Sequence, residues 1–313
     1  MPYVGLHTQQ VRNNSRSVLL LCMFPCLVVL LTFLLCVLLV VFTVAEGNSM
    51  SIWEQSLMML RNLAPFVLVG VAIWFLIAYF ANTAIIRSAT GARPLQRKEN
   101  KRVYNLVENL CMTQGMTMPK INVIEDDSLN AYASGINNKT YTVALSRGII
   151  NHLDDEELEG VIAHELTHIR NRDVRLLVIS IVFVGIFAMI AQLGFRSMIL
   201  GNRRSNDNKG AALLYVIVIL IAVIGYFLSI LMRFAISRKR EYLADADAAG
   251  MTKKPWALAS ALRKISGNPN LQKPAPDDVA QLFIEHSPHK TAFASLFATH
   301  PPIKKRIEML EQF

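Results

Sequence analysis

Residues 154–173 read DDEELEGVIAHELTHIRNRD, and the pattern in this stretch predicts a helix that begins near Asp154. The Asp154 side chain can accept a hydrogen bond from the first turn, and the spacing from Asp154 to Glu157 fits a capping box. Asp155 and Glu156 add negative charge where the helix dipole favours it. The helix should therefore start here and continue through the residues that follow.

The same helix carries His164-Glu165-Leu166-Thr167-His168, an H-E-x-x-H pattern. Residues four apart lie on one helix face, about 5–6 Å apart, so both imidazoles can present a nitrogen to one ion about 2.0–2.1 Å away. Glu165 is placed to reach a water on the metal rather than the metal itself. The alternative is a solvated helix with His-Glu and Glu-Arg side-chain pairs, and the motif alone does not decide between the two.

A zinc ion held by two histidines needs a third protein ligand, and a catalytic site keeps a fourth position for water. A second motif at residues 237–245, SRKREYLAD, predicts a helix that ends at Gly250. Glu241 and Asp245 are four apart and share a helix face. We assign Glu241 as the third ligand and Asp245 as the carboxylate that accepts the other N–H of a ligand histidine. The alternative for both acids is ion pairing with basic neighbours.

The composition indicates a membrane protein. Of 313 residues, 53% are hydrophobic and only 18% are charged, which excludes a disordered chain and a purely cytosolic enzyme. The net charge of +9 would suit nucleic acid or the anionic face of a membrane, and the long apolar runs favour the membrane over nucleic acid. Four charge-free runs reach or approach spanning length: residues 18–45, 64–86, 176–195 and 211–232. The first resembles a secretory signal but is about twice as long, which favours a retained helix.

Basic residues predict the orientation of these runs. The amino-terminal tail has two arginines and no acid, and residues 87–102 hold six basic side chains, which places both segments in the cytoplasm. The basic connector between the third and fourth runs does not follow this rule. The expected parts are a cytoplasmic tail (1–17), a two-helix membrane anchor (18–86), a first part of a polar domain (87–175), a membrane hairpin (176–232) and a second part of that domain (233–313).

Within the polar domain, short β-like segments at residues 120–124, 130–134 and 140–145 predict a small antiparallel sheet, with a hairpin turn at residues 135–139. An amphipathic helix is expected at residues 96–114. The predicted fold class is a mainly α membrane protein with four apolar helices and an α+β domain.

Four motifs occur together: HELTH at 164–168 with Asp173 beyond it, SRKREYLAD at 237–245, NAYASG at 130–135 and THPP at 299–302. Their order resembles the HtpX-like membrane zinc metalloproteases, a bacterial family related to the CAAX prenyl proteases, over nearly the whole chain. The resemblance implies a gluzincin-type protease domain on the cytoplasmic side of the bacterial inner membrane. It also implies a zinc-dependent endopeptidase that acts on damaged or misassembled membrane proteins, with polypeptides and the lipid bilayer as partners.

The resemblance further implies roles that spacing does not supply. Asn130 matches an asparagine of the family's substrate-facing edge strand, and His300 matches a histidine thought to lie near the reacting carbonyl. The alternatives are a turn asparagine and a histidine that caps a helix before Pro301. In the implied mechanism, Glu165 accepts a proton from a zinc-activated water and later delivers it to the leaving amine.

Two other classes of function compete with a protease. A non-enzymatic membrane scaffold or chaperone would use the metal only for structure, but such a site would be closed by a fourth His or Cys, and no Cys lies close by in sequence. A transporter would place ionisable residues within its spans, and the four apolar runs contain none. The sequence leaves the natural substrates and the oligomeric state open.

Overall fold

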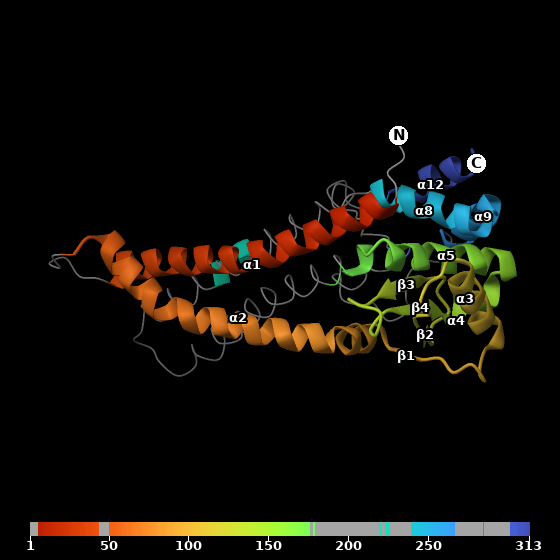
Figure 1. The fold of residues 1–313 in the computed structure, drawn as a ribbon. Helices are drawn as coiled ribbons and strands as arrows, with labels where there is room; N and C mark the ends of the chain where they lie inside the picture. Colours follow the sequence, from red (N-terminus) through yellow and green to blue (C-terminus); the bar gives the residue numbers. More distant parts are fainter. Residues whose placement is uncertain are drawn as a thin grey trace. The chain divides into compact units, whose positions relative to one another are not determined.

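The computed structural model describes residues 6–43, 50–175, 178, 219–220, 223–225, 239–266, 284 and 301–313. These residues form mostly helices and one four-stranded sheet (Figure 1). The chain divides into two compact units, one of Met1–Ser17, Ala81–Val178 and Phe234–Phe313, the other of Val18–Phe80 and Ile179–Arg233. The third and fourth apolar runs lie almost entirely outside the described residues, so their spanning of the membrane stays a prediction.

Two long helices carry the candidate membrane spans found in the described part of the chain. α1 (Leu6–Thr43) contains Cys22–Val41, and α2 (Ile52–Thr90) contains Ile52–Ile77. Each stretch is long and apolar enough to cross a hydrocarbon core about 30 Å thick. α2 begins well before the apolar run expected at 64, because Ser51 and Glu54 cap it: Ser51 N–H donates to Glu54 Oε2 at 2.9 Å, and Glu54 N–H donates to Ser51 Oγ at 3.3 Å.

The sheet is mixed, which corrects the predicted antiparallel arrangement. Its strands are β1 (Ala92–Pro94), β2 (Lys120–Ile124), β3 (Ala131–Ser134) and β4 (Thr142–Ser146). Their order is β1-β2-β4-β3, with β2 parallel to β4 and the other two pairs antiparallel. The chain leaves β2, forms the far edge strand β3, and returns through a hairpin to insert β4 between them. β4 therefore runs parallel to its neighbour β2. This direction follows from the order of the strands in the sheet, which the local sequence pattern does not encode.

The predicted hairpin turn after β3 is present and depends on a glycine. Gly135 has φ +115°, a backbone conformation that side chains disfavour. A Cβ atom at this position would lie 2.6 Å from the carbonyl oxygen of Thr140, so no other residue fits without moving the backbone. The turn holds β3 in register with β4, with Ala131 opposite Leu145 and Ser134 opposite Thr142.

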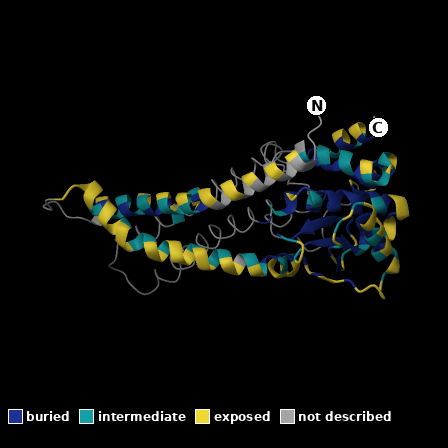
Figure 2. Ribbon diagram, viewed as in Figure 1, coloured by how far each residue is buried: buried dark blue, intermediate teal, exposed yellow. Residues whose placement is uncertain are grey.

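α5 (Asp155–Arg170) is the central helix of the unit that contains the sheet. Its predicted capping box is confirmed: Asp154 Oδ1 accepts the Glu157 N–H at 2.9 Å, and Glu157 Oε2 accepts the Asp154 N–H at 3.0 Å. α5 contacts β3 and β4, and it is mostly buried, as Figure 2 shows. It ends at Arg170 because the next residues turn, with Arg172 at φ +60°.

Five further helices with described bounds lie wholly within this unit. α3 begins later than predicted because the Asn100 side chain caps it, accepting the Val103 N–H at 3.0 Å. α8 and α9 pack against α5, where Gly160 would place a Cβ only 3.2 Å from Leu258 of α9. α12 packs against α8 and α9. The bounds are α3 (Lys101–Thr113), α4 (Arg147–His152), α8 (Lys239–Thr252), α9 (Pro255–Ile265) and α12 (Ile303–Leu310).

Candidate metal centre

α5 brings the two histidines of the H-E-x-x-H motif into contact. The Nε2 atoms of His164 and His168 lie 3.1 Å apart, and their rings meet edge to face at a centroid distance of 4.7 Å. Both side chains are largely withdrawn from solvent, His164 almost completely. One turn of helix therefore presents two imidazole nitrogens to the same point, as the four-residue spacing predicts.

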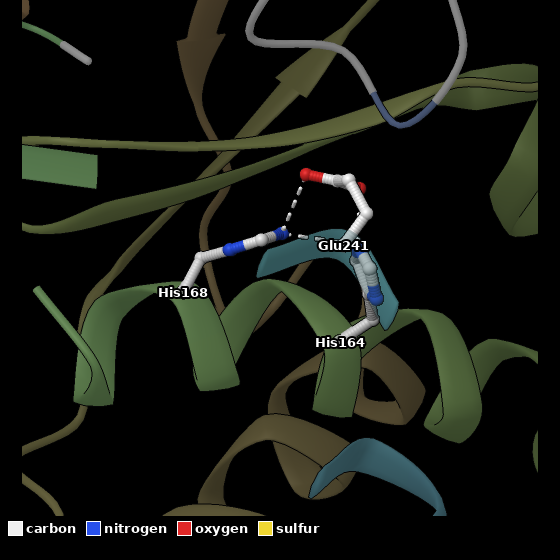
Figure 3. Close-up of side chains that lie close together, drawn as sticks. All are labelled: His164, His168 and Glu241. Carbon is white, nitrogen blue, oxygen red and sulfur yellow. Dashed lines mark hydrogen bonds and ion pairs between the residues drawn. The ribbon is translucent and has the colours of Figure 1, made fainter. Parts of the chain in front are cut away.

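Glu241 reaches the same point from α8, the helix packed against α5 (Figure 3). Its Oε1 lies 3.6 Å from His168 Nε2, and its Oε2 lies 3.7 Å from His164 Nε2. One ligand atom from each of the three residues falls within 4.8 Å of the others, so the three could hold a metal ion together. The structure thus joins residues from two helices that are distant in the chain.

Two aspartates contact the other ring nitrogens of the histidines. His164 Nδ1 lies 3.0 Å from Asp245 Oδ1, and His168 Nδ1 lies 3.2 Å from Asp173 Oδ2. A carboxylate at this distance favours a proton on Nδ1, which leaves the Nε2 lone pair for a cation. Asp245 lies where the sequence-based assignment needs it. The contact of Asp173 was not predicted, because it depends on the left-handed turn at Arg172 that folds the chain back after α5.

Each of these aspartates is paired with an arginine. Arg306 of α12 donates from Nε to Asp245 Oδ2 at 2.8 Å and from Nη2 to Asp245 Oδ1 at 2.7 Å. Arg240 of α8 donates from Nη1 to Asp173 Oδ1 at 3.1 Å. Sequence reasoning missed both arginines. The position of Arg240 next to Glu241 was a usable signal, whereas nothing local to α12 points to Arg306.

The protonation of the site reflects burial and these charges. Burial lowers the pKa of His164, because a charged ring is costly away from water. Burial would also lower the pKa of His168, but the carboxylates of Glu241, Asp173 and Glu165 outweigh it and raise that pKa to about 9. Burial acts to raise the pKa of Asp245, and Arg306 with His164 outweighs it and lowers that pKa to about 2. The field around His168 therefore favours a positive charge, either a proton or a metal ion.

The donor set fits a divalent transition metal. Two imidazole nitrogens with lone pairs facing one another and a carboxylate beside them are the ligands that zinc takes in catalytic sites. The two histidines also have the carboxylate contacts at Nδ1 that metal-binding histidines require. The residues present therefore match the cation that the sequence predicted.

The remaining predicted site residues differ in how they are placed. Glu165 lies on α5 between the two histidines in sequence and is only 2% exposed. Asn130 precedes the edge strand β3, is equally buried, and accepts the Ala131 N–H on its own Oδ1 at 2.9 Å. His300 lies outside the described residues. The catalytic role of Glu165 and the roles of Asn130 and His300 stay predictions.

A buried H-E-x-x-H helix joined to a glutamate on a second helix, beside a small sheet, is the arrangement expected of a metal-dependent peptidase. The chain belongs to peptidase family M48, whose family model matches residues 97–313. This confirms the predicted family and makes the protein a metalloprotease.

Several proteins are similar in sequence to most of this chain. A protease HtpX homolog of Bacteroides fragilis is 62% identical over the full length of both chains. Homologs of the same name from Dictyoglomus thermophilum and Tropheryma whipplei are 40% and 37% identical, covering 77% and 79% of this chain and 81% and 84% of theirs. The crystal structure of S. mikatae Ste24p aligns at 18% identity with a TM-score of 0.46, covering 78% of this chain and 57% of that one.

Proposed function

We propose that the protein is a membrane-anchored zinc endopeptidase that hydrolyses peptide bonds of polypeptide substrates. The observation that carries this proposal is the convergence of His164, His168 and Glu241 within 4.8 Å, with Glu165 buried on the same helix as the two histidines. Three protein ligands leave a fourth position for water or substrate, which separates a catalytic zinc site from a closed structural one.

Different residues of the chain have different proposed roles in peptide-bond hydrolysis. His164, His168 and Glu241 would hold the zinc, which when bound would lower the pKa of its water to about 7 and polarise a carbonyl. Glu165 accepts the proton of the attacking water on its carboxylate and delivers it to the leaving amine. His300 donates a hydrogen bond to the carbonyl oxygen as negative charge develops there, and Asn130 contacts the peptide backbone.

The edge of β3 that faces away from β4 is the proposed binding surface for an extended peptide. In the antiparallel ladder with β4, Ser146 N–H donates to the carbonyl of Asn130, so the main-chain groups of Ala131 and Ala133 point away from β4. The Ala131 carbonyl already accepts the Ile284 N–H at 2.9 Å. Pairing of a substrate would therefore be centred on Ala133, and backbone pairing would tolerate many side chains.

The proposed protease domain is anchored to a membrane and lies on its cytoplasmic side. The candidate spans in α1 and α2 support an anchor at residues 18–86, and the basic residues of 87–102 support a cytoplasmic protease domain, formed by residues 87–175 and 233–313 around a membrane hairpin at 176–232. The bacterial inner membrane, which the resemblance of the four motifs implies, is the proposed location. Damaged or misassembled membrane proteins are the proposed substrates.

Exchange of Glu165 tests the proposal. The Glu165→Gln variant should keep its zinc, because the metal ligands are untouched, and should lose casein hydrolysis by at least about 100-fold, the usual contribution of a general base. His164→Ala should lose both zinc and activity. Metal analysis and casein cleavage by the detergent-purified full chain measure the two effects.

Glu159→Gln provides the matched control, since Glu159 lies on the same helix and pairs with Lys254 at 3.4 Å instead of facing the histidines. This variant should keep both zinc and activity. Full hydrolysis by Glu165→Gln would refute the assignment of the base, and hydrolysis by a zinc-free His164→Ala variant would refute the metal mechanism.

A further inference from the structure

The surroundings of the two histidines repeat one pattern. Each ring contacts an aspartate, and each aspartate is held by an arginine from another part of the chain: His164–Asp245–Arg306 and His168–Asp173–Arg240. Among the described residues, four carboxylates (Asp173, Glu165, Glu241, Asp245) accompany two guanidinium groups (Arg240, Arg306) at this site.

The two arginines are not equivalent. The Arg306 side chain is 0% exposed, whereas that of Arg240 is 16% exposed. Burying a guanidinium away from water is costly unless it is paired, and each of the three nitrogens of Arg306 has a hydrogen-bond partner. Two of its nitrogens bind both oxygens of Asp245, and the third, Nη1, donates to the carbonyl of Ile284 at 3.2 Å. A planar fork bound in this way fixes the plane of the carboxylate as well as its charge.

Arg306 also lies close to the proposed ligands themselves. Its Nη2 is 3.5 Å from His164 Nε2, and its Nη1 is 3.8 Å from Glu241 Oε2. At these distances two effects on a bound cation oppose one another. The positive charge of Arg306 would repel the cation, whereas its grip on Asp245 would orient His164 toward it.

We propose that Arg306 is a positioning residue of the metal centre: its bidentate hold on Asp245 keeps the His164 ring turned so that Nε2 faces the metal. The proposal rests on the proposed zinc site. According to the proposal, α12 supplies none of the three metal ligands but orients one of them, His164. We expect the orientation of His164 to outweigh the repulsion between Arg306 and the cation, because Arg306 binds both oxygens of Asp245 and so fixes its plane.

The proposal is tested by replacing the Arg306 guanidinium and measuring the affinity of the protein for metal. The full chain in detergent is compared with Arg306→Gln and Arg306→Lys by zinc competition with a chromophoric chelator and by the visible spectrum of the cobalt-loaded protein. Arg306→Gln should bind zinc about 10- to 100-fold more weakly, the usual effect of removing a partner of a ligand. Its cobalt spectrum should change. Arg306→Lys keeps the charge without the fork and should fall between that variant and the parent.

Arg263→Gln is the matched control, because Arg263 of α9 also pairs with the end of α12, through Glu311, but its side chain is 51% exposed, whereas that of His164 is 1% exposed. It should bind zinc as the parent does. If Arg306→Gln does not fold, Arg306→Lys decides: weaker zinc binding with a shifted cobalt spectrum supports the proposal, and parental values of both overturn it.

Zinc binding by Arg306→Gln that equals or exceeds that of the parent, with an unchanged cobalt spectrum, would also overturn the proposal, since repulsion or mere structural support would then be the larger effect. A parent chain that takes up no zinc would overturn the proposed function together with this inference. If the parent chain binds zinc tightly and the Arg306 variants bind it equally tightly, only the inference about Arg306 is overturned.

Discussion

Asp173 shows how much of the centre depends on a single residue beyond the motif. It lies five positions after His168, past the end of α5, and reaches back because Arg172 adopts a left-handed conformation. Its two oxygens bridge His168 Nδ1 and Arg240 Nη1 at 3.2 and 3.1 Å. Asp173 therefore connects the helix of the two histidines to the helix of Glu241.

Exchange of Asp173 should weaken metal binding without removing a ligand. Asp173→Asn keeps the size of the side chain but loses the charge that holds the Nδ1 proton of His168, so zinc affinity should fall by about 10- to 100-fold. Chelator competition measures the change. The control is Asp247→Asn, since Asp247 of α8 pairs with Arg170 and Asn171 rather than with a proposed ligand. Equal affinities of the two variants would contradict the role of Asp173.

At the scale of an element, the position of β3 at the sheet edge is the feature that bears on substrate binding. β3 pairs only with β4 within the described residues, and the hairpin at Gly135 fixes which of its main-chain groups point outward. The edge is short, and the Ile284 N–H occupies one of its acceptors. A short edge of this kind can pair with an extended peptide and still resist uncontrolled strand pairing.

Proline at position 133 tests this pairing. Because the Ala133 N–H points away from β4, Ala133→Pro removes an outward donor and leaves the ladder intact. The Michaelis constant for a peptide substrate should rise roughly threefold to tenfold, the effect of one lost hydrogen bond worth about 0.5–1.5 kcal/mol. Zinc content should not change. Ala133→Gly retains the donor and should keep the parental constant, and an unchanged constant in Ala133→Pro would exclude pairing at this residue.

At the scale of the molecule, the candidate centre ties together helices that are far apart in sequence. α5 supplies His164 and His168, α8 supplies Glu241, and α12 supplies Arg306. These contacts lie within the unit that contains the sheet. A metal bound at this point should stabilise the packing of α5 against α8, because it binds the folded arrangement and not the unfolded chain.

Removal of the metal should therefore lower the thermal midpoint of the protein. With free zinc at 100 times its dissociation constant, binding contributes about 2.7 kcal/mol, which corresponds to roughly 5–10 °C. Thermal unfolding of the detergent-purified chain, with and without a chelator, measures the difference, and added zinc should restore the midpoint. Glu241→Gln should show a smaller difference. A midpoint insensitive to both chelator and zinc would argue against a bound metal.

Features that depend on local spacing were predictable from the order of the amino acids alone. The capping box at Asp154 and Glu157, the shared face of His164 and His168, and the turn at Gly135 all follow from neighbours within a few residues, because backbone hydrogen bonding and helix periodicity act over that range. Glu241 was within reach as well, because a hairpin of two spans would return the chain to the same side of the membrane. The same local patterns identified α1 and α2 as candidate spans.

Features that depend on packing between distant segments became visible in the folded chain alone. The parallel pairing of β2 with β4 follows from strand order, and the contacts of Asp173 and Arg306 require a turn after α5 and the docking of α12 on α8. Arg306 in particular has no local signature, since a basic residue on a short carboxyl-terminal helix ordinarily faces solvent. Its burial is stable only because the fold places Asp245 and the Ile284 carbonyl around it, and no local pattern records that proximity.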